Sequence, residues 1–232
     1  LNHGKRFEEA LQLLAARQFI PCEGGEHAVA EEYLVARMGL AIDAMREGAW
    51  HKALTHLADT KSPLPSNLGG GVWHQVMLVP YRYLEGLCKE QIEPGSGRTS
   101  FAAVYDFPIN YFTLMYMPAF PVWKALAARQ LGYHQGARDI LCRFIQQHES
   151  GLVKPAEGYF AATPFFEVFI EDRKSAKRLF HKRLLAFAKA ANGEEREAVR
   201  ICHQVLDSHP SQIKTRLLKE FIDFRERRGI LT

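Results

Sequence analysis

Two glutamates on a glycine-rich loop are the best candidates for chemistry in this sequence. Glu23 and Glu26 flank Gly24 and Gly25, immediately before an apolar stretch with helical spacing. A pair of carboxylates can act as general acid and general base, as in glycoside hydrolysis. The other interpretation is structural, because a carboxylate at the start of a helix complements the helix dipole and caps backbone N–H groups. The structural interpretation is favoured, and the acid–base pair is kept as the alternative.

Other catalytic and metal-binding patterns are absent from the sequence. The ten histidines include no HExxH spacing, and His51 and His56, five residues apart, do not share a helix face. The triglycine at residues 69–71 lacks the Lys-Ser/Thr that follows a phosphate-binding loop. A Ser/His/Asp triad stays open from the sequence, but no nucleophile elbow supports it. We therefore expect no metal, no cofactor and no catalytic activity of the chain's own.

The cysteines point to structural thiols. They are far apart and form no C-x-x-C pair, which argues against a zinc knuckle. Three of the four lie within helical patterns, where cysteine usually serves as a small buried apolar side chain. The residues are Cys22 and, within the helical patterns, Cys88, Cys142 and Cys202.

Basic and aromatic residues gather in two stretches. Lys174, Arg178 and Lys182 recur every four residues, while Leu179 and Phe180 fall on the other side, which predicts an amphipathic helix with a solvated basic face. A nucleic-acid surface would also need exposed aromatic side chains among the cations. The aromatic residues of the second stretch either fill a core or line a groove for sugar rings or a peptide. They are Tyr105, Phe107, Tyr111, Phe112, Tyr116, Phe120 and Trp123.

Three segments share a layout that predicts pairs of antiparallel helices. In each, a helical stretch ends at a glycine, and an alanine follows five residues later in a second helical stretch. Glycine suits the end of a helix because that position often needs a positive φ, and a small alanine lets two helices cross closely. The pairs are Gly48–Ala53, Gly132–Ala137 and Gly193–Ala198, in units near residues 30–65, 117–149 and 178–210.

The other segments fit around these units. We expect an opening helix that contains Phe7 and Leu14, a helix over residues 72–89 with a kink or late start at Pro80, and a flexible break at residues 94–97. The pattern of residues 211–228 predicts a final helix with one apolar face and charged residues elsewhere, which would cap the end of the repeat stack. The predicted fold is one all-α domain over residues 1–232, a right-handed α-α superhelix of tetratricopeptide-like repeats.

Three loops carry a family resemblance. Residues 19–26 resemble a Pro-Trp-Glu-Gly-Gly-Glu loop, residues 65–71 a Pro-Glu-Asn-Leu-Gly-x-Gly loop, and residues 159–172 an Asp-Tyr-Phe-Ala…Pro…Phe-x-x-Asp stretch. These loops occur in the tetratricopeptide-repeat region of bacterial proteins that carry the domain of unknown function 5107, and the likeness covers nearly the whole chain. Cys22 stands where that family has Trp, and Gly158 where it has Asp.

The resemblance implies a helical-repeat platform attached to a large β-rich domain in a carbohydrate-related setting. The sequence begins without Met, so we expect a part of a longer protein, and the resemblance implies that this part is C-terminal to another domain. The expected localisation is cytoplasmic. The expected function is binding or scaffolding, with another domain of the parent protein, a protein or a peptide as partner, and carbohydrate as a further ligand. Nucleic acid and membrane are not expected as partners.

An accessory part of a carbohydrate-active enzyme, completed by the β-rich domain, is the alternative function. In either case the Gly-rich loops are the expected contact regions. The candidate ligand- or partner-binding residues are Glu23, Glu26, Asn67, Trp73 and Tyr159.

Overall fold

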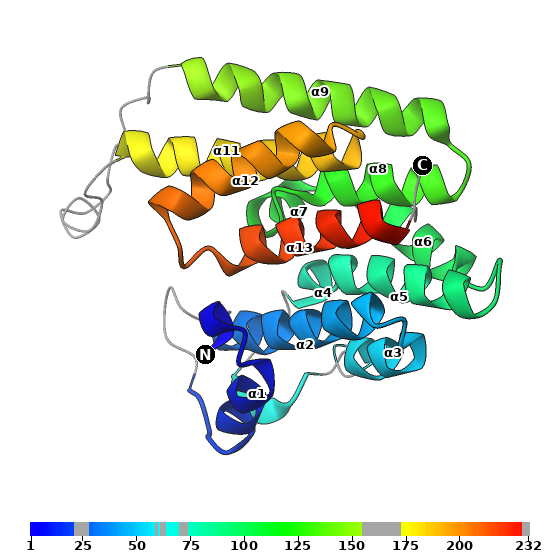
Figure 1. Ribbon diagram of the computed structural model, residues 1–232, viewed down its shortest axis with the longest axis vertical. Coiled ribbons are helices and arrows are strands. Elements are labelled where there is room, and N and C mark those ends of the chain that lie inside the picture. The colour runs from blue at the N-terminus through cyan, green and yellow to red at the C-terminus, as the bar shows by residue number, and fades with distance from the viewer. Residues whose placement is uncertain (21–27, 59, 61–63, 70–73, 155–172, 229–232) are drawn as a thin grey trace.

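The regular structure is helical. The computed structural model describes residues 1–20, 28–58, 60, 64–69, 74–154 and 173–228, and helices are the only regular elements in these ranges (Figure 1). The predicted all-α class is therefore confirmed. The α-helices are α1 (Phe7–Ala15), α2 (Ala28–Arg46), α3 (Trp50–Ala58), α4 (His74–Met77), α5 (Val79–Ile92), α6 (Arg98–Tyr105), α7 (Tyr111–Tyr116), α8 (Phe120–Gln130), α9 (His134–Val153), α11 (Arg173–Ala191), α12 (Glu195–Ser208) and α13 (Ile213–Arg228), with 3-10 helices η1 (Asn2–Gly4) and η2 (Ser66–Leu68).

The three predicted helix pairs are present as α2–α3, α8–α9 and α11–α12, and their corners share one backbone geometry. Gly48, Gly132 and Gly193 have φ values of 76°, 90° and 86°. In each corner the glycine N–H donates to the carbonyl three residues earlier, and the next N–H donates to the carbonyl five residues earlier. These two bonds satisfy the last carbonyls of the first helix and form a Schellman motif.

The alanine of each corner is fully buried, as the layout predicts. Ala53, Ala137 and Ala198 have 0% exposure near the beginning of the second helix of each pair. Replacing any of the three with leucine is expected to lower the free energy of unfolding by about 1–3 kcal/mol, because the core has no room for the added atoms. Urea denaturation of the three variants measures this. Ala176, exposed on α11, provides the control, and its change to leucine should be close to neutral.

A fourth pair, α5–α6, follows the first in chain order. Its corner contains Gly95, with φ of 90°, and the buried Ser100 five residues later. The Gly-to-Ala pattern missed this pair because serine occupies the alanine position. The break expected at residues 94–97 is present as the corner between α5 and α6, where the Glu90 carboxylate accepts the N–H groups of Gly95 and Gly97 at 2.8 and 3.0 Å.

The break predicted near Pro80 is confirmed. Helix α4 ends at Met77 and α5 begins at Val79, which places Pro80 in the first turn of α5. Proline is tolerated there because the first N–H groups of a helix have no intrahelical partner. The predicted opening helix is also present as α1, with Phe7 and Leu14 buried.

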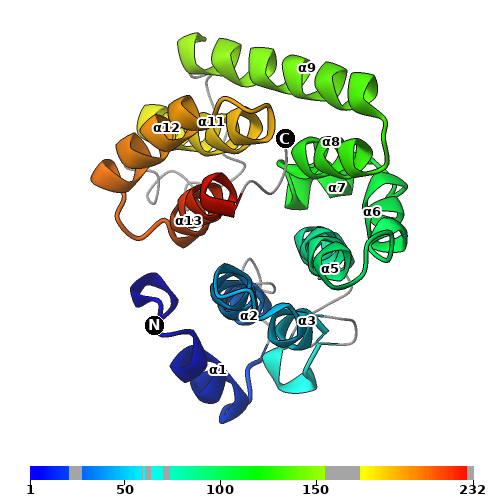
Figure 2. The ribbon, with the colours of Figure 1, turned by 45° about the vertical axis from the view of Figure 1, so that its right-hand side comes forward.

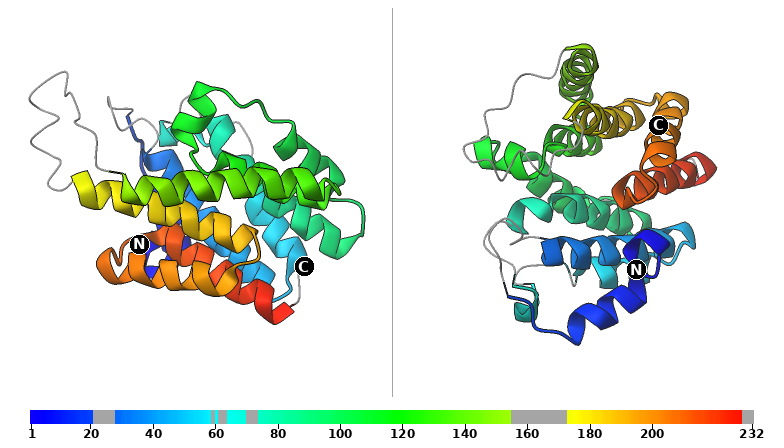
Figure 3. Two further views of the ribbon diagram at one scale, coloured as in Figure 1. Left: turned by 90° about the horizontal axis from the view of Figure 1, so that it is seen from above. Right: turned by 90° about the vertical axis from the view of Figure 1, so that its left-hand side faces the viewer.

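Helix α13, the last described helix, contacts helices from the beginning of the chain. It packs against both α12 and α2, so the helices follow one another around a nearly closed path (Figures 2 and 3). Ile213 and Leu217 of α13 are buried in one apolar cluster with Phe7 and Val35. Glu220 lies 2.9 Å from the Lys5 ammonium and 3.6 Å from the Arg46 guanidinium, while Arg216 donates to the carbonyl oxygen of His3 at 2.8 Å. The predicted capping helix therefore also contacts the beginning of the chain.

Two side chains lie differently from the prediction. Phe180, placed on the apolar side of α11, is 43% exposed. Helical periodicity gives the direction of a side chain, but it does not tell whether a neighbouring helix extends far enough to cover it. Cys142 is exposed because the buried stripe of α9 passes through the adjacent Leu141, and successive residues point about 100° apart.

Candidate binding site

Of the five predicted contact residues, the structure places Asn67. Its side-chain amide donates to the backbone carbonyl oxygens of Leu14 and Arg17, both at 2.8 Å. The backbone carbonyl of Asn67 accepts the N–H of Phe19. Asn67 thus ties η2 to the end of α1. The other four, Glu23, Glu26, Trp73 and Tyr159, lie outside the described residues, so a contact role for the set stays a prediction.

Part of the aromatic stretch packs in or against the core, which agrees with the first of its two interpretations; these residues are Tyr105, Phe107, Phe120 and Trp123. Phe120 is buried, and the Trp123 ring lies 5.6 Å from Tyr83 and 4.7 Å from Phe187, between ring centroids. These tilted contacts link α5, α8 and α11. Tyr111 of α7 differs, with an exposed fraction of 75%. Core packing therefore explains the ring contacts between α5, α8 and α11, but it does not explain the exposed Tyr111 of α7.

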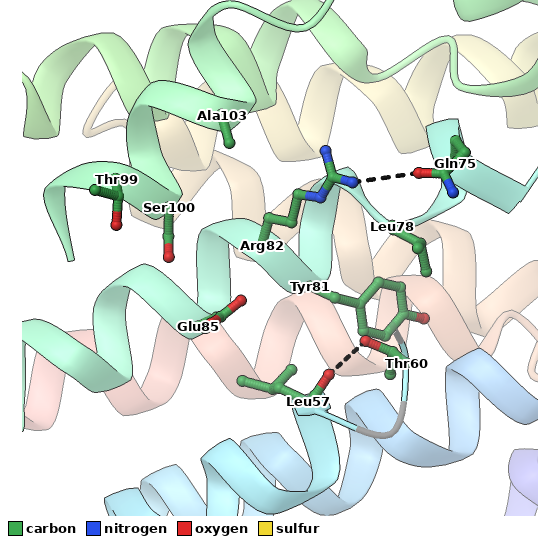
Figure 4. A pocket seen from close by; sticks show the side chains of 10 residues that line it. All are labelled: Leu57, Thr60, Gln75, Leu78, Tyr81, Arg82, Glu85, Thr99, Ser100 and Ala103. Carbon is green, nitrogen blue, oxygen red and sulfur yellow. Dashed lines mark hydrogen bonds between the residues drawn. The ribbon is translucent and has the colours of Figure 1, made fainter. Parts of the chain in front are cut away.

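A cavity of about 380 Å³ opens between the pair α2–α3 and the pair α5–α6 (Figure 4). Its walls come from the end of α3, the α4–α5 junction and the first turns of α6. Sequence patterns gave no indication of it, because residues from three separate segments meet only after the pairs stack. The lining residues are Leu57, Thr60, Gln75, Leu78, Tyr81, Arg82, Glu85, Thr99, Ser100 and Ala103.

The cavity has a polar side and an apolar side. Arg82 donates to the side-chain oxygen of Gln75 at 3.3 Å, and Glu85 is paired with Lys89 at 2.7 Å. Leu57, Leu78 and the ring of Tyr81 form the apolar side. Burial, with a smaller contribution from the charge of Glu31, raises the pKa of Tyr81 well above its usual value. The phenol is therefore neutral at physiological pH.

Two of the cysteines are buried, protonated thiols. Burial raises the pKa of Cys88 to about 12 and that of Cys202 to about 11, so both thiols stay protonated. Within the residues that the structure describes, no group of three or more His, Cys, Asp or Glu side chains is arranged to hold a metal ion.

A histidine pair joins α9 to α11. The Nδ1 atoms of His148 and His181 are 2.8 Å apart, His148 is 4% exposed, and the His181 ring covers the backbone of Gly151. One Nδ1 must donate and the other accept, because two N–H groups cannot face each other at this distance. The contact therefore needs at least one neutral ring with an unprotonated Nδ1.

Acid is expected to weaken the α9–α11 contact. Burial, and then His181, lowers the pKa of His148 from 6.5 to about 4, and burial with Lys177 lowers that of His181. The unfolded chain then binds protons more readily than the folded chain, so this contribution is present above pH 6.5 and is lost as the pH falls toward 4. The loss of stability from pH 7 to pH 5 should be smaller in His181→Gln than in the parent. His203→Gln, at an exposed histidine of α12, should match the parent.

No helix in the described ranges combines the length and the apolar character needed to cross a membrane. Comparison of the chain with protein-family models, with curated proteins and with solved structures returned no match.

Proposed function

We propose that the chain is a helical-repeat binding module without catalytic activity of its own. The observation that carries the proposal is the cavity between two successive helix pairs, which offers hydrogen-bond donors on one side and apolar side chains on the other. Most small-molecule sites combine an apolar lining with a few placed polar groups. Stacked helix pairs form such sites at their junctions, where side chains from neighbouring units converge.

The repeat architecture of the helices is part of the same proposal. We infer a right-handed α-α superhelix of tetratricopeptide-like repeats, related to the region that accompanies the domain of unknown function 5107. Three Schellman corners of equal geometry and a fully buried alanine in each support this inference. In such a parent protein, the Gly-rich loops that include Asn67 would contact the neighbouring domain or another protein partner.

The lining favours binding over chemistry. The Glu85 carboxylate is ion-paired with the Lys89 ammonium. The raised pKa of Tyr81 keeps its phenol protonated and therefore weakly basic. A general base works best with a pKa near neutral pH, so the Tyr81 phenol does not fit that role.

A thermal-shift panel with a cavity-filling variant tests the proposal. The panel contains neutral sugars, short peptides, small acids, small amines and inorganic phosphate. At least one class should raise the melting temperature of the parent, and Ala103→Trp should remove that rise because Ala103 is an exposed lining residue. Ala176→Trp, on the exposed side of α11, should keep it. If no class raises the melting temperature, or if Ala103→Trp leaves the rise unchanged, the cavity is not the binding site.

Catalysis is tested separately with chromogenic glycosides and esters. The expected result is no turnover by the parent above the rate in buffer. Turnover that both Glu23→Gln and Glu26→Gln abolish would overturn the proposal and support the acid–base pair of a carbohydrate-active protein.

A further inference from the structure

We propose that the cavity between α3, α5 and α6 recognises a carboxylate attached to a small apolar body, with Arg82 as the partner of the carboxylate. This inference rests on the proposed binding function and adds the chemical class of the ligand. It combines three observations: a cation that pairs with no carboxylate among the described residues, hydroxyl groups beside it, and an apolar wall.

Arg82 carries the charge argument. Its side chain is half-buried, and its hydrogen bond goes to the neutral amide of Gln75 at 3.3 Å. Among the described residues, no carboxylate pairs with it, whereas the more exposed Arg6 and Arg200 each pair with a glutamate on their own helix turn. A guanidinium has five N–H donors in a planar fork that matches a carboxylate, and a partly desolvated cation gains from such a partner.

The other charges around the cavity allow a single negative charge. Glu85 also lines the cavity, but the Lys89 ammonium lies 2.7 Å from its carboxylate. Counted over the lining residues Arg82 and Glu85 and the Lys89 that pairs with Glu85, the excess is one positive charge; Glu31, whose charge acts on Tyr81, is not a lining residue. A singly charged carboxylate matches this excess, while a doubly charged phosphate exceeds it and is repelled by Glu85 more strongly.

Hydroxyl groups on α6 complete the polar side. Ser100 is 7% exposed, and its oxygen accepts a hydrogen bond from Lys89 at 3.3 Å. That bond uses the oxygen as an acceptor, so the hydroxyl proton can be donated to a ligand. Thr99 adds a second hydroxyl in the same turn. In the view of Figure 4, Arg82 lies between Gln75 and this pair of hydroxyls.

The apolar side defines the rest of the ligand. Leu57, Leu78, Ala103 and the ring of Tyr81 supply the carbon atoms of the lining. The volume of about 380 Å³ lies at the small end of ligand sites, which span roughly 300–1,000 Å³. A phenylalkanoic acid has both the size and the division into charged and apolar ends that this lining needs.

Calorimetric titration at pH 7 with three matched probes tests the assignment. The probes are 4-phenylbutanoate, the neutral 4-phenylbutanamide and the cationic 4-phenylbutylamine. The acid should bind at least about tenfold more tightly than the amide, because a charge-assisted pair replaces a neutral contact. Equal affinity for acid and amide, with both lost in Ala103→Trp, would overturn the carboxylate assignment but leave the binding function intact. Tighter binding of the amine would also overturn it and would point to Glu85.

Substitutions of Arg82 provide the second part of the calorimetric test. Arg82→Gln should lose about tenfold or more in affinity for the acid and leave the amide unchanged, and Arg82→Lys should retain part of the preference. Arg178→Gln removes an exposed cation of α11 and should bind as the parent does. Melting temperatures near the parent value show that the variants are folded. An acid affinity unaffected by Arg82→Gln, or no binding of any probe, would refute the inference.

A peptide probe distinguishes the two sources of such a carboxylate. Acetyl-Gly-Gly-Phe with a free C-terminus presents the same chemistry at the end of a chain. Tighter binding of this peptide than of 4-phenylbutanoate would assign the site to a chain terminus, and weaker binding would assign it to a free acid. Either result supports carboxylate recognition, provided that the C-terminal amide of the peptide binds less tightly than the acid.

Discussion

Phe101→Ala is expected to lower the free energy of unfolding by about 3–5 kcal/mol, because it removes a buried ring and leaves a cavity. Phe101 is 1% exposed, and its ring packs on Tyr83 with 5.6 Å between centroids. Phe180, which is 43% exposed on α11, is the matched control. Phe180→Ala should change the stability by about 1 kcal/mol or less. Chemical denaturation with fixed protein concentration compares the two variants directly.

Gly86 provides a second test of the packing between α5 and α6, where the Phe101 ring lies against α5. A Cβ atom at Gly86 would lie 2.5 Å from Cε1 of Phe101, whereas a Cβ at Gly136 of α9 meets no atom within 4 Å. Gly86→Ala should therefore destabilise the parent, while Gly136→Ala should stabilise it by about 0.5–1 kcal/mol through its helix propensity. In the Phe101→Ala background, the penalty of Gly86→Ala should largely disappear. A penalty that persists without the ring would show that Phe101 is not the obstacle.

Leu217→Ala is expected to lower the free energy of unfolding by about 2–5 kcal/mol, as for other buried leucines. Leu217 is 3% exposed and belongs to the cluster that α13 shares with Phe7 and Val35. Leu13 of α1, which is 44% exposed, is the control, and Leu13→Ala should cost about 0.5 kcal/mol or less. Denaturation midpoints of both variants measure the difference.

Amide hydrogen exchange then shows whether α13 joins the ends of the chain. In Leu217→Ala, exchange should become faster in α13 and also in α1 and α2, because these three helices share the disturbed cluster. Faster exchange limited to α12 and α13 would contradict the closure and indicate an ordinary terminal helix.

The sequence by itself determined the class of the fold and three of its helix pairs. These features depend on local rules: a glycine with positive φ ends a helix, and apolar residues recur at the helical period. Gly48, Gly132 and Gly193 therefore marked their corners without knowledge of the rest of the chain. The same locality explains the misses. Ser100 could replace alanine at the fourth corner because the position requires a small side chain rather than one residue type.

Only the tertiary structure decided the candidate site, the histidine pair and the closure of the chain. Arg82 and Ser100 are separated by the α5–α6 corner, and Leu57 belongs to the preceding pair. His148 and His181 lie on different pairs, and Leu217 meets Phe7 across almost the whole sequence. Such contacts depend on how far each helix extends and on the angle at which it crosses its neighbours. These quantities come from the packing of whole helix surfaces, and no short stretch of sequence encodes them.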